Sequence, residues 1–328
     1  MIETDAAIDA LLCGPPFAVA PATDVGDFAL ALTPSEEGHL ADWLSETATD
    51  VMSVLDQVGA ILFRGFPDGG DIEFDRCIEA LGLQPFTYAE SLSNAVRKNR
   101  TPRVFTANEA PPELEIFLHH EMAQTPLYPR YLFFYCEQAA ASGGATPLCR
   151  SDYLMAALER QLPSFIKQCR DLGVSYTHTM PAQADAGSGQ GRSWRSTLSA
   201  ETIEEAETKL SRLGYQWEWE KDGALSVTTP VLPAIRTAKD GRKVFFNQLI
   251  AAFRGWQDAR NVGEKSICFG DYSTISNDDM AVVIRLSDLL TFDIPWQTGD
   301  VVLVDNFLAM HGRRPFEGQR RVLASLVA

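Results

Sequence analysis

The chain has 328 residues, of which 45% are hydrophobic, so it can bury a sizeable core. Its net charge of −16 would repel phosphate backbones, which excludes a general nucleic-acid binder. No run of about eighteen apolar residues occurs, so we expect no membrane span. The acidic N-terminus lacks the basic segment of a signal peptide, and the six cysteines form no C-x-x-C motif. Both features favour a cytoplasmic protein with reduced thiols.

Helices and strands are expected to alternate in the first half of the chain. Apolar residues near helical spacing predict a helix within 35–58, and the apolar run "GAILFRGFP" directly after it predicts a buried strand. A second helix is expected over 71–81. The aromatic run "RYLFFYCEQ" (130–138) predicts a strand, and "SGGATPLCR" (142–150) predicts a turn followed by an extended segment.

A mostly helical insertion is predicted over residues 150–213. Its clearest helix has Ser199 as the candidate N-cap and Gly214 as its stop. The apolar face of this helix comprises Ile203, Ala206, Leu210 and Leu213. The Gly/Ser-rich stretch 177–193 is the best candidate for a mobile loop.

Short strands are expected to follow the insertion. The run "YQWEWEKDGALSVTTPVLPAI" alternates and turns at Asp222-Gly223, which is a hairpin signal. Further strands are predicted in "KVFFNQLI", "IPWQTGDVVLVDNFLAMHG" and "RRVLASLVA". We therefore expect a mainly β protein with α insertions, folded as a single domain over 1–328.

Two of the five histidines lie beside a glutamate in "FLHHEMAQTPLYPRYLFFY" (117–135). His120-Glu121 matches the start of the zinc-protease helix motif H-E-x-x-H, but residue 124 is Gln, and the prolines that follow would break such a helix. The alternative is a strand, in which residues i and i+2 share one face. His119 and Glu121 could then converge on one metal ion while His120 points elsewhere.

A third metal ligand must come from another part of the chain. His311 ends the strand-like run "VLVDNFLAMHG" and is the natural partner, while His39 and His178 remain candidates. Two histidines and one carboxylate on one face of an octahedral ion are typical of non-haem Fe(II) oxygenases. Arg320 and Arg321 lie nine and ten residues after His311, and an arginine there could bind a distal carboxylate through its guanidinium fork.

The chain resembles the Fe(II)/2-oxoglutarate-dependent dioxygenases of the taurine dioxygenase superfamily, in particular the syringomycin-hydroxylase-like branch found in natural-product biosynthesis. The resemblance covers the chain from about residue 58 to its end. It rests on blocks in the family's order: "GAILFRGF", "VFTANEAPPELEIFLHHEM", "YLFFYCEQAAASGGATPL", "GYQWEWEKDGAL", "KVFFNQ" and "WQTGDVVLVDNFLAMHGRRPFEGQRRVLAS".

The resemblance implies a double-stranded β-helix core (a jelly roll, cupin-like) with flanking helices. It implies that His119, Glu121 and His311 bind Fe(II), and that Thr146 and Arg321 bind the cosubstrate 2-oxoglutarate, with O₂ as oxidant. The implied reaction is hydroxylation of an unactivated C–H bond in an amino-acid-derived small molecule, either free or tethered to a carrier protein, in secondary metabolism such as antibiotic biosynthesis. Desaturation, epoxidation or cyclisation at the same centre stay open.

Three positions depart from the family pattern. Glu121 stands where many relatives have Asp, and halogenating relatives lack this carboxylate, so Glu121 argues against halogenation. Ser325 occupies the place of an additional, sulfonate-binding arginine in the taurine enzyme, so a sulfonate substrate is not expected. His120 stands where many close relatives have asparagine, and it either supports the metal site or faces solvent.

The substrate contacts are less clearly indicated. The candidates are Thr106, Asn108, His120 and Asn247. A basic cluster in "RKNRTPR" comprises Arg97, Lys98, Arg100 and Arg103. It is either a solvated loop or a site that recognises a substrate carboxylate or a carrier protein. Two distant alternatives are a non-catalytic jelly-roll binding protein and a zinc hydrolase that uses the same three ligands.

Overall fold

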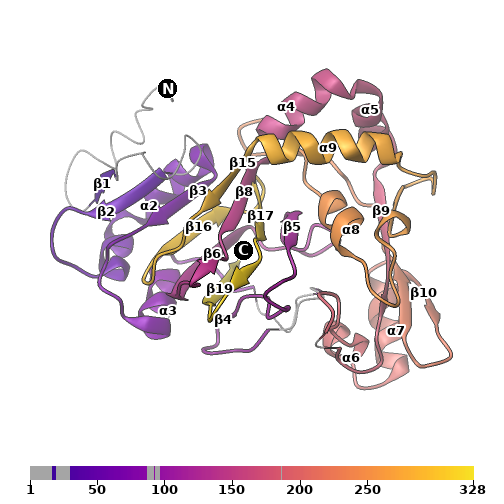
Figure 1. Ribbon diagram of the computed structural model, residues 1–328, viewed down its shortest axis with the longest axis horizontal. Helices are drawn as coiled ribbons and strands as arrows, with labels where there is room; N and C mark the ends of the chain where they lie inside the picture. The colour runs from indigo at the N-terminus through magenta and orange to yellow at the C-terminus, as the bar shows by residue number, and fades with distance from the viewer. Residues whose placement is uncertain (1–16, 20–29, 87–91, 93–96, 186) are drawn as a thin grey trace.

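A computed structural model of the protein describes residues 17–19, 30–86, 92, 97–185 and 187–328. Two β-sheets pack face to face at its centre, and helices cover the outer face of each (Figure 1). The architecture is mainly sheet with helices, as the sequence predicted.

The larger central sheet has seven strands among the described residues, in the order β1-β2-β3-β16-β6-β19-β4. These strands are Phe17–Val19 (β1), Leu30–Pro34 (β2), Ala60–Phe63 (β3), Val301–Asp305 (β16), Tyr131–Gln138 (β6), Arg321–Val327 (β19) and Phe105–Thr106 (β4). Neighbouring strands are antiparallel except for β2 and β3. Sequence segments from both ends of the chain therefore lie side by side in one sheet.

The smaller central sheet has the order β15-β8-β17-β5. Its strands are Thr291–Ile294 (β15), Thr146–Arg150 (β8), Ala309–Arg313 (β17) and Ile116–His119 (β5). Leu148 and Ala309 of this sheet share a buried cluster with Val302 and Ala324 of the larger sheet. This cluster forms the core between the two sheets, because small and branched apolar side chains on the facing surfaces interdigitate there.

Helices bury the two outer faces. Strands of the larger sheet alternate, so that Ile61 and Phe63 face the helices α2 (Leu40–Val58) and α3 (Gly70–Ala80). On the other side, Cys149 and Met310 of the smaller sheet pack against a second set of helices. That set comprises α4 (Ser151–Gln161), α5 (Pro163–Leu172), α8 (Leu249–Gly255) and α9 (Asn277–Leu289).

A separate four-stranded sheet lies beside this core, in the order β10-β11-β9-β14 (Figure 1). Its strands are Gln216–Trp219 (β10), Leu225–Thr228 (β11), Val174–Met180 (β9) and Ile267–Phe269 (β14). The remaining helices are α6 (Trp194–Leu198), α7 (Ile203–Arg212) and the short helix Gly263–Lys265. Two further pairs of strands are β7 (Ser142–Gly143) with β18 (Phe316–Glu317), and β12 (Arg236–Thr237) with β13 (Lys243–Val244). The predicted hairpin at Asp222-Gly223 is confirmed, since it joins β10 to β11.

Several predicted boundaries are wrong. Ser199 is not an N-cap but ends α6 in a left-handed conformation. Helix α7 begins instead after Thr202, whose hydroxyl accepts from the backbone of Glu205 while the Glu205 carboxylate accepts from the backbone of Thr202. This Thr-x-x-Glu capping box satisfies two orphan N–H groups, which a lone serine cannot do.

The structure also adds a strand to the predicted insertion 150–213, because β9 lies within it. Four residues of the predicted mobile loop 177–193 belong to this strand. Within "KVFFNQLI", only Lys243–Val244 (β13) forms a strand. Helix α8 follows it, because the Asn247 side chain accepts a hydrogen bond from the Leu249 backbone and helps to start the helix there.

No helix within the described ranges is long and apolar enough to cross a membrane. The five cysteines in the described part of the chain are free, and burial raises the pKa of the Cys136, Cys149 and Cys169 thiols to about 12. These thiols are therefore protonated and unreactive at neutral pH. Cys13 lies outside the described residues.

Candidate active site

The sheet register brings two histidines together from distant parts of the chain. His119, the last residue of β5, pairs directly with His311 of the antiparallel neighbour β17. Their ring centroids lie 4.3 Å apart. The Glu121 Oε2 atom lies 3.9 Å from His119 Nε2 and 3.5 Å from His311 Nε2. The three side chains therefore converge as predicted, with their ligand atoms within 4.8 Å of one another.

Glu121 is placed at this site by a turn, and not by a strand as the sequence predicted. Strand β5 ends at His119, and residues 121–124 form a turn, so the shared face of a strand does not explain the convergence. Met122 has a positive φ of 57°, which reverses the chain directly after Glu121. Because this segment is a turn and not a helix, it also lacks the geometry of the zinc-protease motif.

Two of the three side chains, His119 and Glu121, are held in the protonation states that metal ligands need. The ring of His119 is hydrogen-bonded through Nδ1 to the Phe117 carbonyl at 2.8 Å, which leaves Nε2 directed at the site. Burial lowers the pKa of His119 to about 4, so its ring is neutral at pH 7. Burial alone would raise the pKa of Glu121, but Arg97 and the two histidines outweigh it and hold that pKa below its usual range. A neutral imidazole and an ionised carboxylate fit a divalent ion such as Fe(II).

Arg97 is the one member of the basic cluster that enters the site. Its Nη2 atom lies 3.1 and 3.2 Å from the two carboxylate oxygens of Glu121, and only 8% of its side chain is exposed. The Phe105 ring packs against its guanidinium. The other three cluster members form ion pairs nearer the surface, Lys98 with Glu109, Arg100 with Asp71 and Glu137, and Arg103 with Asp75 and Glu79. Arg97 therefore lines the cavity, whereas Lys98, Arg100 and Arg103 belong to the surface.

His120 points away from the site and is fully buried. Its Nδ1 is hydrogen-bonded to the Asn306 carbonyl, and its Nε2 lies 2.5 Å from the Ser151 hydroxyl. Burial lowers the pKa of His120 to about 3, so the ring is neutral. The prediction that His120 contacts substrate is therefore wrong, and so is the solvent-facing alternative. His120 ties the metal-site turn to the start of helix α4.

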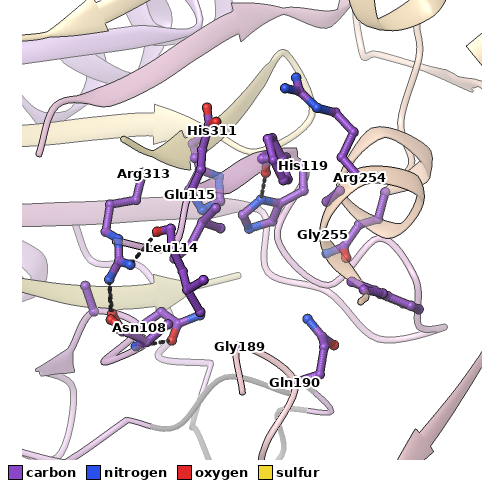
Figure 2. Close-up of a pocket in the computed structure, with 18 of the residues that line it drawn as sticks. Asn108, Leu114, Glu115, His119, Gly189, Gln190, Arg254, Gly255, His311 and Arg313 are labelled. Carbon is purple, nitrogen blue, oxygen red and sulfur yellow. Dashed lines mark hydrogen bonds between the residues drawn. The ribbon is translucent and has the colours of Figure 1, made fainter. Parts of the chain in front are cut away.

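A cavity of about 520 Å³ opens from the three side chains. Its inner part is lined by Phe134, Thr146 and Arg320, and a wall that includes Asn108 and Leu114 closes one side (Figure 2). The segments 187–190 and 254–258 form the opposite side, with Gln190 and Gly255 labelled there in Figure 2. The cavity lies within the size range of small-molecule sites.

The arginine that lines the cavity is Arg320, and not Arg321 as the sequence predicted. Arg321 is outside the cavity lining, with 54% of its side chain exposed and its Nε donating to Glu137 Oε2 at 2.7 Å. Arg320 lines the cavity and donates through Nε to the Gly144 carbonyl at 2.9 Å. The two neighbours point in opposite directions where β19 begins. Gly144 has φ +72°, and a Cβ there would lie 2.9 Å from Arg320 Cδ, so glycine leaves room for the arginine stem.

The Arg320 guanidinium and the Thr146 hydroxyl form the polar end of the cavity. Trp296 donates to Thr146 Oγ1 at 2.9 Å, which orients the hydroxyl. Burial, and then the charge of Arg313, lower the pKa of Arg320 to about 10, so it remains a cation at neutral pH. No carboxylate among the described residues forms an ion pair with Arg320 or Arg313. A partly buried cation that has no carboxylate partner favours an anionic ligand.

The other candidate residues divide between the cavity and the surrounding structure. Asn108 lines the cavity, as predicted. Thr106 does not, because its hydroxyl accepts from the Lys98 backbone. Asn247 does not either, because its side chain is engaged by Ala234 and Leu249.

The alternative third ligands lie elsewhere. His39 is the N-cap residue of α2, with 52% of its side chain exposed. His178 is buried in β9 beside Trp256, outside the lining of the main cavity. Neither belongs to the metal-ligand cluster found among the described residues.

Arg313 is a functional residue that the sequence analysis missed. It is the last residue of β17, two positions after His311, and its guanidinium donates to four backbone carbonyls of the cavity wall. Figure 2 shows Arg313 directed at the segment that contains Asn108 and Leu114. The acceptors are the carbonyls of Asn108, Ala110, Pro111 and Leu114, at 2.7–3.2 Å. No periodicity or motif indicates such a contact, because every residue type has a backbone carbonyl. Arg313 therefore holds the wall of the cavity against strand β17, which also contains His311.

We expect Arg313→Met to lower the free energy of unfolding by about 3 kcal/mol, because several buried carbonyls lose their donor at once. The matched control is Arg314→Met, since Arg314 forms more exposed ion pairs with Glu115 and Asp293. That control should cost less than about 1 kcal/mol. Urea unfolding followed by circular dichroism measures both, and equal losses would contradict the role given to Arg313.

Two imidazoles and one carboxylate beside a cation-lined cavity, set between facing sheets, are typical of the class of non-haem iron oxygenases. The family model "Taurine catabolism dioxygenase TauD, TfdA family" matches residues 29–326. The chain belongs to this family. It is an Fe(II)- and 2-oxoglutarate-dependent dioxygenase, an oxidoreductase that uses O₂ and acts on a small molecule.

Relatives with known names support the same family. The chain is 38% identical over 275 residues to a clavaminate synthase-like protein of Arabidopsis thaliana, with 84% of this chain and 83% of that protein covered. It is 27% identical over 292 residues to the dapdiamide synthesis protein DdaC of Enterobacter agglomerans, with coverage of 84% and 83%. The fold is similar to that of PvcB from Pseudomonas aeruginosa, with a TM-score of 0.57 and 14% identity over 95% of this chain and 91% of PvcB.

Proposed function

We propose that His119, Glu121 and His311 hold the Fe(II), and that Thr146 and Arg320 bind the distal carboxylate of 2-oxoglutarate. The convergence of the three side chains is the observation on which this proposal chiefly rests. We further propose that the two facing sheets form a double-stranded β-helix (jelly roll) and that 1–328 is one domain, with 150–213 as an insertion. The iron, with 2-oxoglutarate bound, supplies the activation of O₂, and the cosubstrate is converted to succinate and CO₂.

The protein's own part is to bind, orient and exclude water. Phe134 packs its ring 5.3 Å from that of His311, which keeps one flank of the metal site apolar. Phe117 and Trp256 line the outer part of the cavity. These rings limit the water around the reacting carbon, while the polar end holds 2-oxoglutarate in one orientation.

The proposed reaction is hydroxylation of an unactivated C–H bond. Glu121 would supply a third protein ligand to the iron, which would leave no place for a halide ligand. Desaturation, epoxidation or cyclisation would use the same side chains. A role in the biosynthesis of a small molecule is supported by the relative named for dapdiamide synthesis.

The side chains beside the proposed metal ligands fit a substrate that has a carboxylate. Arg97 lines the cavity next to Glu121, with 8% of its side chain exposed. A guanidinium can bind a carboxylate through two charge-assisted hydrogen bonds. Arg97 is therefore the proposed contact for a substrate carboxylate, which fits an amino-acid-derived substrate.

Anaerobic addition of Fe(II) and then 2-oxoglutarate tests the metal centre. A visible charge-transfer band should appear only when both are present, because the cosubstrate must chelate the iron. On exposure to O₂, succinate should form. Absence of the band, or equal activity with Zn(II), would refute the proposal and favour a hydrolase. A chlorinated product in high chloride would refute the role given to Glu121.

A screen of free and acylated amino acids tests the substrate class. Each compound is compared with its carboxamide as a stimulator of succinate formation. We expect at least one acid to stimulate about ten-fold or more over its amide, because only the acid can form a charge-assisted pair with Arg97. Arg97→Gln should remove the difference. A carrier-tethered substrate has this carboxyl group in a thioester, so equal stimulation by acid and amide would contradict carboxylate recognition and favour a tethered substrate.

A further inference from the structure

The backbone of Glu121 lies beyond the reach of the sheet that fixes the two histidines. His119 and His311 are registered opposite each other by the β5–β17 ladder. Glu121 comes two residues after the end of β5 and directly before the positive φ of Met122. A turn of this kind is not held by ladder hydrogen bonds, so its position requires other contacts.

The side chain of Asn306 provides those contacts. Its Oδ1 accepts from the Glu121 backbone N–H at 2.7 Å, and its Nδ2 donates to the Glu121 carbonyl at 3.1 Å. These are the two hydrogen bonds that a neighbouring strand would make to the residue. Nδ2 also donates to the Pro129 carbonyl at 2.8 Å, and Asn306 is fully buried. The Asn306 side-chain amide therefore makes the two hydrogen bonds that a neighbouring strand would otherwise make to the Glu121 backbone.

Asn306 is itself fixed to both sides of the metal site. Its backbone N–H donates to the Arg130 carbonyl at 3.0 Å, and its carbonyl is hydrogen-bonded to the His120 ring. It follows β16 directly and lies five residues before His311. The segment that leads into the third ligand thus also holds the carboxylate ligand.

We infer that Asn306 is the positioning residue of the metal site, which sets where the Glu121 carboxylate lies relative to the two histidines. The inference rests on the proposed metal ligands. Asn306 does not line the cavity, and it acts through the Glu121 backbone. Groups that orient ligands in this way commonly affect metal affinity about ten- to a hundred-fold.

The test compares metal affinity in two variants of matched chemistry. Asn306→Asp keeps the size of the side chain but replaces the Nδ2 donor by an oxygen that faces the Glu121 and Pro129 carbonyls. Asn247→Asp is the control, because Asn247 is 2% exposed and makes one donor and one acceptor contact to backbone, with Ala234 and Leu249. Co(II) alone is the probe, titrated calorimetrically and by its visible absorption.

We expect Asn306→Asp to weaken Co(II) binding about ten- to a hundred-fold and Asn247→Asp to change it less than about three-fold. Asn306→Ser provides a second variant without the added charge. The rise in Tm at saturating Co(II) gives a measure that holds even in a destabilised variant, since it depends on affinity for the folded state. It should be smaller for both Asn306 variants.

Equal Co(II) affinity and equal Tm rises in the Asn306 and Asn247 variants would overturn the inference. This outcome is distinct from failure of the proposed function. If wild-type protein binds Co(II) but forms no Fe(II)–2-oxoglutarate band, the proposed reaction fails while the role of Asn306 is still tested by the affinities.

Discussion

Arg320→Ala is expected to raise the apparent KM for 2-oxoglutarate about ten- to a hundred-fold, with a much smaller effect on the KM for the prime substrate. The guanidinium lies at the polar end of the cavity beside Thr146, where it can form a charge-assisted pair with the distal carboxylate. Loss of such a pair costs roughly 1.5–3 kcal/mol, and each 1.4 kcal/mol is a factor of ten in affinity.

Arg321→Ala is the matched control, since it removes the adjacent guanidinium from a solvent-exposed ion pair with Glu137. It should leave the KM for 2-oxoglutarate within about two-fold. Initial rates of succinate formation over a range of 2-oxoglutarate concentrations measure both variants. A large effect of Arg321→Ala, with little effect of Arg320→Ala, would return the assignment to the arginine that the sequence analysis favoured.

His119→Ala is expected to weaken metal binding more than about a hundred-fold, whereas His120→Ala should change it only a few-fold. His119 presents Nε2 to the Glu121 carboxylate, and His120 is directed the opposite way, to Ser151 and Asn306. Even groups that only orient a ligand commonly contribute about ten- to a hundred-fold in affinity, so removal of a ligand should cost more.

The effects of the two variants on stability should be in the opposite order, with His120→Ala destabilising the protein more than His119→Ala. His120→Ala leaves a space in a fully buried region and removes two hydrogen bonds, so we expect a loss of about 2–4 kcal/mol in the free energy of unfolding. The metal-free His119→Ala protein should lose less, because its ring borders the cavity. Metal content after anaerobic reconstitution and urea unfolding separate the two effects, and similar metal loss in both variants would contradict the assignment.

The convergence of His119, Glu121 and His311 could be predicted from the sequence because it depends on residue types and their order. Histidine is scarce in this chain and chemically specific, and the blocks around these residues follow a recognisable order. Their geometry could not be predicted in the same way. The turn at Glu121 depends on the positive φ of Met122, a residue type that seldom adopts it, and on hydrogen bonds from Asn306 across 185 positions of the chain.

The choice between Arg320 and Arg321 shows a second limit. Adjacent strand residues face opposite sides, so one position decides whether a guanidinium lies in the cavity or in solvent. The ladder shifts register between Arg321 and Val322, and no local pattern marks such a shift. Arg313 presents the same difficulty, because its acceptors are backbone carbonyls that have no signature in the sequence.

The pairing of His119 with His311 has a consequence for biosynthesis of the protein. The two histidines lie about 190 positions apart. A ribosome-bound chain cannot close this ladder before His311 has emerged, and contacts of such long range form slowly. A nascent chain that stops before His311 therefore presents His119 and Glu121 without their third partner, so the three-residue site cannot form on it.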